Sequence, residues 1–133
     1  MNILFFLIPK EKVQYVTTNM TIRQVLEKMK VHRYSSIPLL TKEGLYYGSI
    51  SEGDLLNYIS EHELDFETLE DINILAVERY RNYKSISINN NIEDLIDLSM
   101  EQNFVPVIDD YKTFIGIVTR KDIIMYIKNK NIK

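Results

Sequence analysis

The sequence contains no cysteine and only two histidines, His32 and His62. A chain without cysteine can have no disulfide framework, no thiolate metal site and no cysteine nucleophile. Two isolated histidines do not suggest a histidine-rich metal site. We therefore expect no metal and no required cofactor.

Long apolar runs are also absent. The longest extends from Ile3 to Ile8 and ends at Pro9-Lys10, far short of the roughly 20 residues that a membrane-spanning helix needs. It also lacks the preceding basic residues and the following small-residue cleavage site of a signal peptide. We interpret it as a buried terminal strand or a partner-facing segment. The expectation is a cytoplasmic protein that does not bind membranes.

The charge is slightly acidic, with 16 basic and 19 acidic residues and a formal net charge of −3 at pH 7. A nucleic-acid-binding domain usually carries a basic surface, so we do not expect this function. The 133 residues are 45% hydrophobic and 26% charged. These values are ordinary for a globular protein and predict one domain or one tightly paired module.

The most informative feature is an internal repeat. Its anchors are a proline, a glycine and an aspartate, and the two copies lie 68 positions apart at each anchor: Pro38 and Pro106, Gly48 and Gly116, Asp54 and Asp122. Upstream the separation is 70, as between Ile22 and Ile92, because the first copy has two extra residues before its proline. Self-similarity of this kind indicates a duplicated structural unit.

Each copy predicts the order β-α-β-β-α. An amphipathic helix follows the N-cap residue Thr21 in the first copy and Asn91 in the second. The expected strands are 13–16, 37–40 and 45–50 in the first copy and 85–88, 105–108 and 114–118 in the second. A last helix begins near Ser51 or Thr119. The fold class is therefore α/β.

The repeat divides the chain into four parts. Residues 1–60 form the first repeat with an N-terminal strand, and residues 77–128 form the second. Between them, residues 61–76 are rich in acidic side chains, and we expect a solvated helical linker. Residues 129–133 are expected to be a polar, frayed tail.

The segment from the glycine to the aspartate could hold a phosphorylated ligand. The glycine leaves room for a ligand, and the free N–H groups of the helix start attract phosphate. The aspartate can accept hydrogen bonds from ligand hydroxyls, such as those of a ribose. Ser51 with Asp54, and Thr119 with Asp122, also fit a capping box, which needs no ligand. Spacing alone leaves both interpretations open.

These residues resemble a pair of cystathionine-β-synthase-type (CBS) domains. The similarity rests on Ile37-Pro38-Leu39-Leu40 with Gly48 to Asp54, and on Val105-Pro106-Val107-Ile108 with Gly116 to Asp122. It implies two pseudo-symmetric repeats packed through their sheets, and adenine nucleotides bound in clefts between them. It also implies a homodimer and a regulatory role without catalysis.

The family pattern combines the motif of one repeat with the pre-proline strand of the other. The Asp122 cleft would contain Gly116, Ile117, Thr119, Arg120, Lys121 and Asp122 together with Gln14, Ser35, Ser36 and Ile37. The Asp54 cleft would contain Ser51 and Asp54 with Lys84, Phe104 and Val105. Because Arg120 and Lys121 are basic whereas Glu52 is acidic, we expect the Asp122 cleft to bind phosphate better.

The expected function is that of a regulatory module, not an enzyme. It would bind an adenosine-containing nucleotide such as AMP, ADP or ATP and signal to a target protein that the sequence does not identify. Cyclic di-AMP and S-adenosylmethionine are equally compatible with the motifs. The alternative is a ligand-free interaction module that dimerises or scaffolds a partner.

Overall fold

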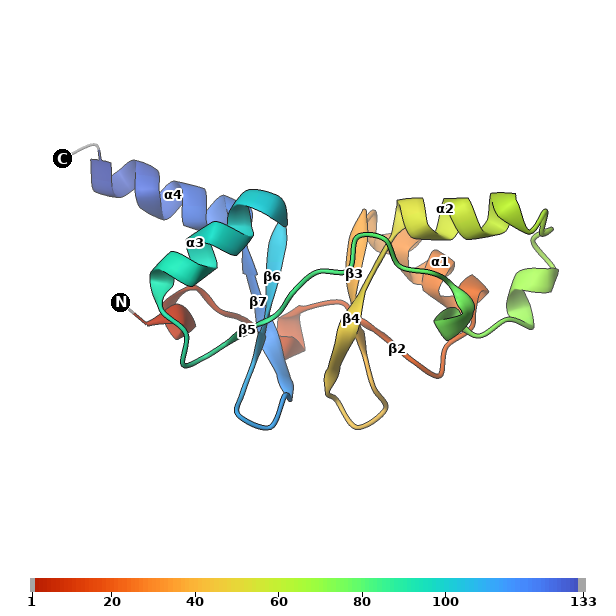
Figure 1. Cartoon of the computed structure of the whole chain (residues 1–133), viewed down its shortest axis with the longest axis horizontal. Coiled ribbons are helices and arrows are strands. Elements are labelled where there is room, and N and C mark those ends of the chain that lie inside the picture. The colour runs from red at the N-terminus through yellow and green to blue at the C-terminus, as the bar shows by residue number, and fades with distance from the viewer. Residues whose placement is uncertain (1, 132–133) are drawn as a thin grey trace. The chain divides into compact units, whose positions relative to one another are not determined.

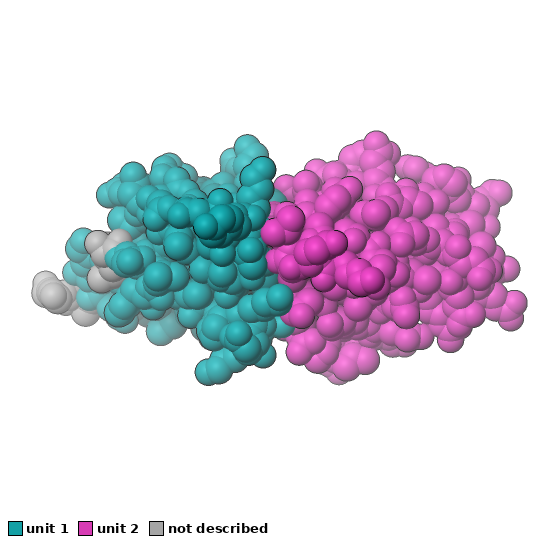
Figure 2. Space-filling view, turned by 90° about the horizontal axis from the view of Figure 1, so that it is seen from below, with its two compact units in different colours: residues 1–13, 83–133 teal, residues 14–82 magenta. Residues whose placement is uncertain are grey.

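The computed structural model describes residues 2–131, and Figure 1 shows the course of the chain. The chain forms two compact units, coloured separately in Figure 2. One unit contains residues 14–82, and the other contains residues 1–13 together with 83–133. Each unit has its own hydrophobic core.

The unit of residues 14–82 contains the first repeat. Its elements are β2 (Val16–Thr17), α1 (Ile22–His32), β3 (Ser36–Leu40), β4 (Tyr46–Ser51) and α2 (Glu52–Glu61). The strands form a sheet of order β2-β3-β4, with β2 and β3 parallel and β3 and β4 antiparallel. A capping box between Thr21 and Gln24 starts α1, whose buried face contributes Ile22, Val25 and Met29 to the core.

The other unit contains the second repeat. Its elements are β5 (Ile86–Ser87), α3 (Ile92–Glu101), β6 (Phe104–Ile108), β7 (Phe114–Thr119) and α4 (Arg120–Asn131). The side chain of Asn91 caps α3 by accepting the N–H of Asp94. The order β-α-β-β-α thus occurs twice, and the α/β prediction is confirmed. The first strand of each repeat has only two residues, shorter than expected.

The N-terminal segment belongs to the unit of the second repeat. Ile3–Phe6 form a 3₁₀ helix, not a strand, and β1 (Ile8–Pro9) pairs antiparallel with β7. This addition gives a sheet of order β1-β7-β6-β5. The side chains of Ile3 and Phe6 are buried in the second core, so the interpretation of this run as buried is right for these two residues.

The predicted linker, residues 61–76, is exposed over most of its length but does not form one continuous helix. Beyond α2 the segment forms two short 3₁₀ helices, Thr68–Glu70 and Ile74–Ala76. Leu69, Ile74 and Val77 are buried in the core of the first unit. The acidic side chains alternate with apolar residues, and burial of the apolar side chains determines the path of the segment.

The prediction of a frayed tail is also partly wrong, because α4 continues to Asn131. The last two residues of the predicted tail, Ile132 and Lys133, lie outside the described residues. Between residues 2 and 131, no helix has the length and apolarity needed to cross a membrane.

Candidate functional site

The two Gly-to-Asp motifs occupy equivalent positions, each at the junction of a strand and a helix. Ser51 is the N-cap of α2, and its side chain accepts the N–H of Asp54 at 3.1 Å. In the second repeat the hydroxyl of Thr119 accepts the N–H of Asp122 at 3.2 Å. The capping interpretation is therefore correct for both hydroxyls. The two aspartates, however, have different surroundings.

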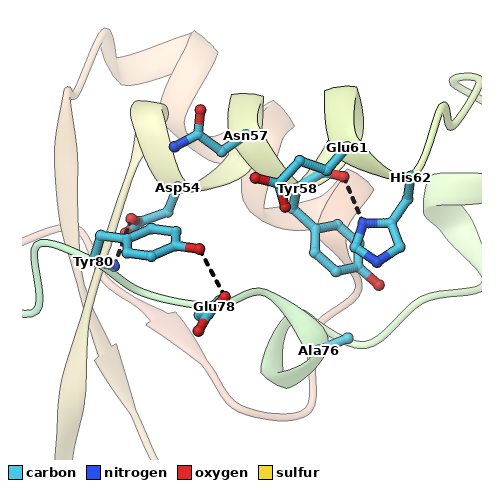
Figure 3. Close-up of a pocket in the computed structure, with 8 residues that line it drawn as sticks. All are labelled: Asp54, Asn57, Tyr58, Glu61, His62, Ala76, Glu78 and Tyr80. Carbon is cyan, nitrogen blue, oxygen red and sulfur yellow. Dashed lines mark hydrogen bonds between the residues drawn. The ribbon is translucent and has the colours of Figure 1, made fainter.

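The carboxylate of Asp54 is buried, and both of its oxygens accept backbone hydrogen bonds. The residue is 2% exposed. Its Oδ2 accepts the N–H of Ser51 at 3.1 Å, which completes the capping box, and its Oδ1 accepts the N–H of Tyr80 at 2.9 Å. Figure 3 shows Asp54 at the start of α2, directed toward the backbone of Tyr80. Asp54 thus fastens the segment between the repeats to the first unit.

Further contacts of residues 79–82 cover the glycine of the same motif. The Asn82 Oδ1 accepts the N–H of Ser49 at 2.9 Å, and the Ser49 hydroxyl donates to the carbonyl of Arg81 at 3.3 Å. A Cβ at Gly48 would overlap the guanidinium of Arg79 and the amide of Asn82. The close approach that requires this glycine is made by the chain's own segment.

The carboxylate of Asp122 has no such partners. The residue is half-buried, and among residues 2–131 its side-chain oxygens have no hydrogen bond or ion pair. It lies in a groove of about 540 Å³. A half-buried carboxylate without a protein partner is available to accept hydrogen bonds from a ligand.

The glycine of the second motif is covered by β1. Gly116 pairs with Pro9, and a Cβ at Gly116 would overlap the carbonyl oxygen of Ile8. In both repeats, therefore, an extended segment from outside the repeat lies against the motif glycine. It is the N-terminal segment in the second repeat and residues 79–82 in the first.

The two basic residues after Thr119 are arranged differently. Arg120 is half-buried, and its Nε donates to the carbonyl of Ser99 at 2.7 Å, near the C-terminal end of α3. Lys121 is exposed at the first turn of α4. Its ammonium group is the freer of the two cations beside Asp122.

The grooves next to the two aspartates are equivalent to each other. Four positions of α2 line the first groove, and the positions 68 residues later in α4 line the second: Asp54, Asn57, Tyr58 and Glu61, then Asp122, Met125, Tyr126 and Asn129. The opposite walls also correspond, since Ala76 and Glu78 lie 70 positions after Phe6 and Ile8. We call them the first groove and the second groove.

The two grooves differ in chemical character: acidic side chains line the first, and apolar side chains line most of the second. The first groove, about 370 Å³, is lined by Glu61 and Glu78 together with His62 and Tyr80 (Figure 3). The Tyr80 hydroxyl donates to the Glu78 carboxylate at 2.7 Å, and this hydrogen bond raises the pKa of the phenol. The second groove is lined instead by Phe5, Phe6, Leu7 and Met125, with Asp122 as its one acidic residue.

The remaining predicted site residues are divided between the units. The first unit contains Gln14, Ser35, Ser36 and Ile37, and the second contains Lys84, Phe104, Val105 and Ile117. Ile37, Phe104 and Val105 are buried, whereas Ser35 and Lys84 are exposed. Of all the predicted nucleotide-binding residues, only Asp54 and Asp122 line the grooves described above.

Sequence reasoning missed two features. One is the segment of residues 79–82, whose Arg81 carbonyl and Asn82 side chain bond Ser49 although no local sequence pattern indicates it. The other is Gln102, a buried residue whose amide links the chain before β5 to β6 through Lys84 and Phe104. In the described part of the chain, no cluster of three or more metal-ligating side chains is present.

Comparison with known families identifies the class of protein that this fold and these motifs define. The sequence model of the CBS domain matches residues 7–61 and 77–129, which together make up most of the chain. The chain belongs to the CBS domain family, as the two motifs suggested.

Individual relatives are more distant. An uncharacterised 17.7 kDa protein of Acidianus ambivalens is 25% identical over 116 residues, which cover 84% of this chain and 65% of the relative. The L-aspartate semialdehyde sulfurtransferase of Methanocaldococcus jannaschii is 22% identical over 106 residues, which cover 80% of this chain but only 19% of that enzyme. The chain therefore spans less than two-thirds of the length of either relative.

One solved structure matches over almost its full length. The CbpB protein of Listeria monocytogenes, solved in complex with c-di-AMP, is 29% identical with a TM-score of 0.84. The match covers 96% of this chain and 95% of that one.

Proposed function

We propose that this protein is a regulatory module without catalytic activity that binds an adenosine-containing nucleotide through the motif of its second repeat. The observation that carries the proposal is the contrast between the two aspartates. Asp54 is buried and holds two backbone N–H groups, whereas the carboxylate of Asp122 has no partner among residues 2–131. In this proposal Asp122 accepts hydrogen bonds from ribose hydroxyls.

Charge supports the same assignment. Lys121 is exposed beside Asp122, and the N-terminus of α4 adds the positive end of a helix dipole. These groups favour a phosphate next to the ribose. Gly116, Ile117, Thr119 and Arg120 would complete this half of the site.

The first repeat has no equivalent free carboxylate. Asp54 is 2% exposed, and each of its carboxylate oxygens already accepts a backbone N–H, from Ser51 and from Tyr80. The carboxylate of Glu52, at the start of α2, would also repel a phosphate. We therefore propose that each chain binds one nucleotide, and that Ser51, Lys84, Phe104 and Val105 do not form a second functional site.

The ligand of the Listeria relative makes c-di-AMP the first compound to test, and AMP, ADP and ATP follow. Each compound would be titrated into the protein by isothermal calorimetry, with the matching guanosine compounds as the specificity control. We expect binding of at least one adenosine compound with one site per protomer. Equal affinities for adenosine and guanosine compounds would contradict the assignment of an adenosine ligand.

The residue assignment is tested by Asp122→Ala. We expect a loss of affinity of about tenfold or more, because two charge-assisted hydrogen bonds are removed. Asp97→Ala is the matched control, since Asp97 is an exposed carboxylate on α3 of the same unit. Full binding by the Asp122 variant would show that this carboxylate is not the ribose acceptor.

If the protein binds none of these compounds, the alternative function is that of a ligand-free interaction module. Exposed apolar side chains on the N-terminal segment and on α4 favour a module that dimerises or holds a target protein without a ligand. In the nucleotide-binding function the same surfaces would transmit the signal. A ligand that shifts the protein between two arrangements must bind them with different affinity.

A further inference from the structure

We propose that Arg120 connects the second motif to the C-terminal end of α3, so that a ligand at Asp122 and the order of that helix end stabilise each other. Arg120 is a positioning residue in this proposal, because it acts by holding the first turn of α4 against α3. The coupling to a ligand rests on the proposed nucleotide site. The contact between Arg120 and α3 does not depend on that site.

The two repeats end their first helix in different ways. After α1 the chain turns at Arg33, whose φ is 56°, and the N–H of Tyr34 donates to the carbonyl of Met29 at 3.0 Å. The second repeat is two residues shorter between this helix and its proline. It has no such turn, because the chain is already extended at Gln102. The carbonyl of Ser99, which is equivalent to that of Met29, therefore needs another donor.

Arg120 supplies this donor. Its Nε donates to the carbonyl of Ser99 at 2.7 Å, and its backbone N–H donates to the carbonyl of Asn103 at 2.9 Å. The first repeat has only the backbone contact, in which the N–H of Glu52 donates to the carbonyl of Ser35 at 2.9 Å. Glu52 is the equivalent of Arg120, and an ionised carboxylate cannot donate to a carbonyl. The side-chain contact with the helix end is therefore a feature of the second motif.

Charge gives a second reason for an arginine at this position. The sequence of α3 has no basic residue and four acidic ones, Glu93, Asp94, Asp97 and Glu101. Two of these, Asp97 and Glu101, lie in the C-terminal half, where the helix dipole is negative. The last turn of α1, by contrast, contains Lys30 and His32. The guanidinium of Arg120 thus offsets a charge that α3 does not offset by itself.

The contact reaches the candidate nucleotide site because Arg120 lies between Thr119 and Asp122. The hydroxyl of Thr119 accepts the N–H of Asp122, so these residues form one turn at the start of α4. Disorder at the end of α3 would release Arg120 and loosen this turn. A ligand that binds the ordered turn favours it, and by linkage an ordered end of α3 raises the affinity for that ligand.

Hydrogen exchange measured by mass spectrometry tests the contact in the ligand-free protein. Arg120→Met removes the donors but keeps an apolar stem, so the loss of packing is small. We expect the amides of residues 99–102 to exchange about tenfold faster in this variant, because a hydrogen bond from a charged group is lost. Arg120→Lys keeps a charged donor and should retain most of the protection. Lys121→Gln, which removes the adjacent charge, is the matched control and should leave this exchange unchanged.

The coupling is tested by repeating the measurement with c-di-AMP at a concentration that saturates each variant in calorimetry. We expect the ligand to slow exchange of residues 99–102 by about threefold or more in the wild type and in Arg120→Lys, and to leave it unchanged in Arg120→Met. A helix end that is only less stable would still be protected by the ligand. This comparison therefore separates coupling through Arg120 from a loss of stability.

Three results would overturn the proposal. Equal exchange of residues 99–102 in the ligand-free wild type and Arg120→Met would show that Arg120 does not cap α3. Equal protection by c-di-AMP in these two proteins would show that the ligand acts on α3 by another route. Complete loss of binding in Arg120→Met would make Arg120 a direct ligand contact. If the wild type binds no adenosine compound, the proposed function fails and the coupling fails with it, whereas the ligand-free comparison still decides the contact with α3.

Discussion

At the scale of single residues, equivalent positions of the two repeats have taken different roles. Asp54 and Asp122 occupy the same position of the repeat, and each lies three residues after a capping hydroxyl. Asp54 satisfies the backbone N–H groups of Ser51 and Tyr80. The carboxylate of Asp122 accepts no hydrogen bond from any of the described residues. The same side chain is thus structural in one repeat and free for a ligand in the other.

This contrast predicts that replacing each aspartate with alanine lowers the free energy of unfolding by a different amount. Asp54→Ala would leave two N–H groups of low exposure without an acceptor, so we expect the free energy of unfolding to fall by about 1–3 kcal/mol. Asp122→Ala should change it by less than about 0.5 kcal/mol, because the carboxylate has no protein partner to lose. Urea denaturation followed by circular dichroism measures both. Equal losses would contradict the division of roles.

The sequence could predict the aspartates as a pair but not this division. The spacing from Ser51 to Asp54 equals that from Thr119 to Asp122, and both fit a capping box. What separates them is Tyr80, whose N–H reaches Asp54 from a segment 26 residues further along the chain. No local pattern encodes a contact of that kind. The flanking charges predict that the Asp122 site favours phosphate, and only a binding measurement can test this prediction.

At the scale of elements, periodicity and caps predicted most of the helices and strands. Thr21, Ser51 and Asn91 each begin the helix that the sequence assigned to them. The segment after α2 was expected to be a solvated helix; its acidic side chains are exposed, but it forms two short 3₁₀ helices and buries Leu69 and Ile74. Its structure follows from the few apolar side chains among them, and their packing partners lie in α1 and the first sheet.

One substitution pair tests whether that segment is part of the core. Ile74 is fully buried, whereas the next residue, Leu75, is 47% exposed. We expect Ile74→Ala to lower the free energy of unfolding by about 2–5 kcal/mol. Leu75→Ala in the same short helix should have an effect within about 0.5 kcal/mol. Chemical denaturation measures the free energy of unfolding of both variants. Similar changes for the two would indicate that the segment is not packed in the core.

A second pair tests the strand that covers the second motif. Ala at position 116 would overlap the backbone of Ile8, which cannot move without detaching β1 from β7. Ala at position 48 would displace only the side chains of Arg79 and Asn82. We therefore expect Gly116→Ala to destabilise the protein by more than Gly48→Ala, with about 1–3 kcal/mol for the larger effect. The reverse order in thermal unfolding would refute this interpretation.

At the scale of the whole molecule, the repeats are alike in fold and unlike in charge. The helix α2 has the acidic residues Glu52, Asp54 and Glu61, whereas α4 has four basic residues and one aspartate. Although the two helices occupy equivalent positions of the repeat, they therefore present different charges to the solvent.

The pairing of β1 with β7 has a consequence for how the chain folds. Ile8 and Ile117 are neighbours in the sheet although most of the sequence lies between them. During synthesis, residues 2–13 leave the ribosome long before their partner strand exists, so the sheet of the second repeat is completed by a segment made more than 100 residues earlier. Contacts between such distant residues slow folding. A circular permutant that begins at Gln14 and joins Lys133 to Met1 would make each compact unit continuous in sequence, and it should fold faster than the natural order.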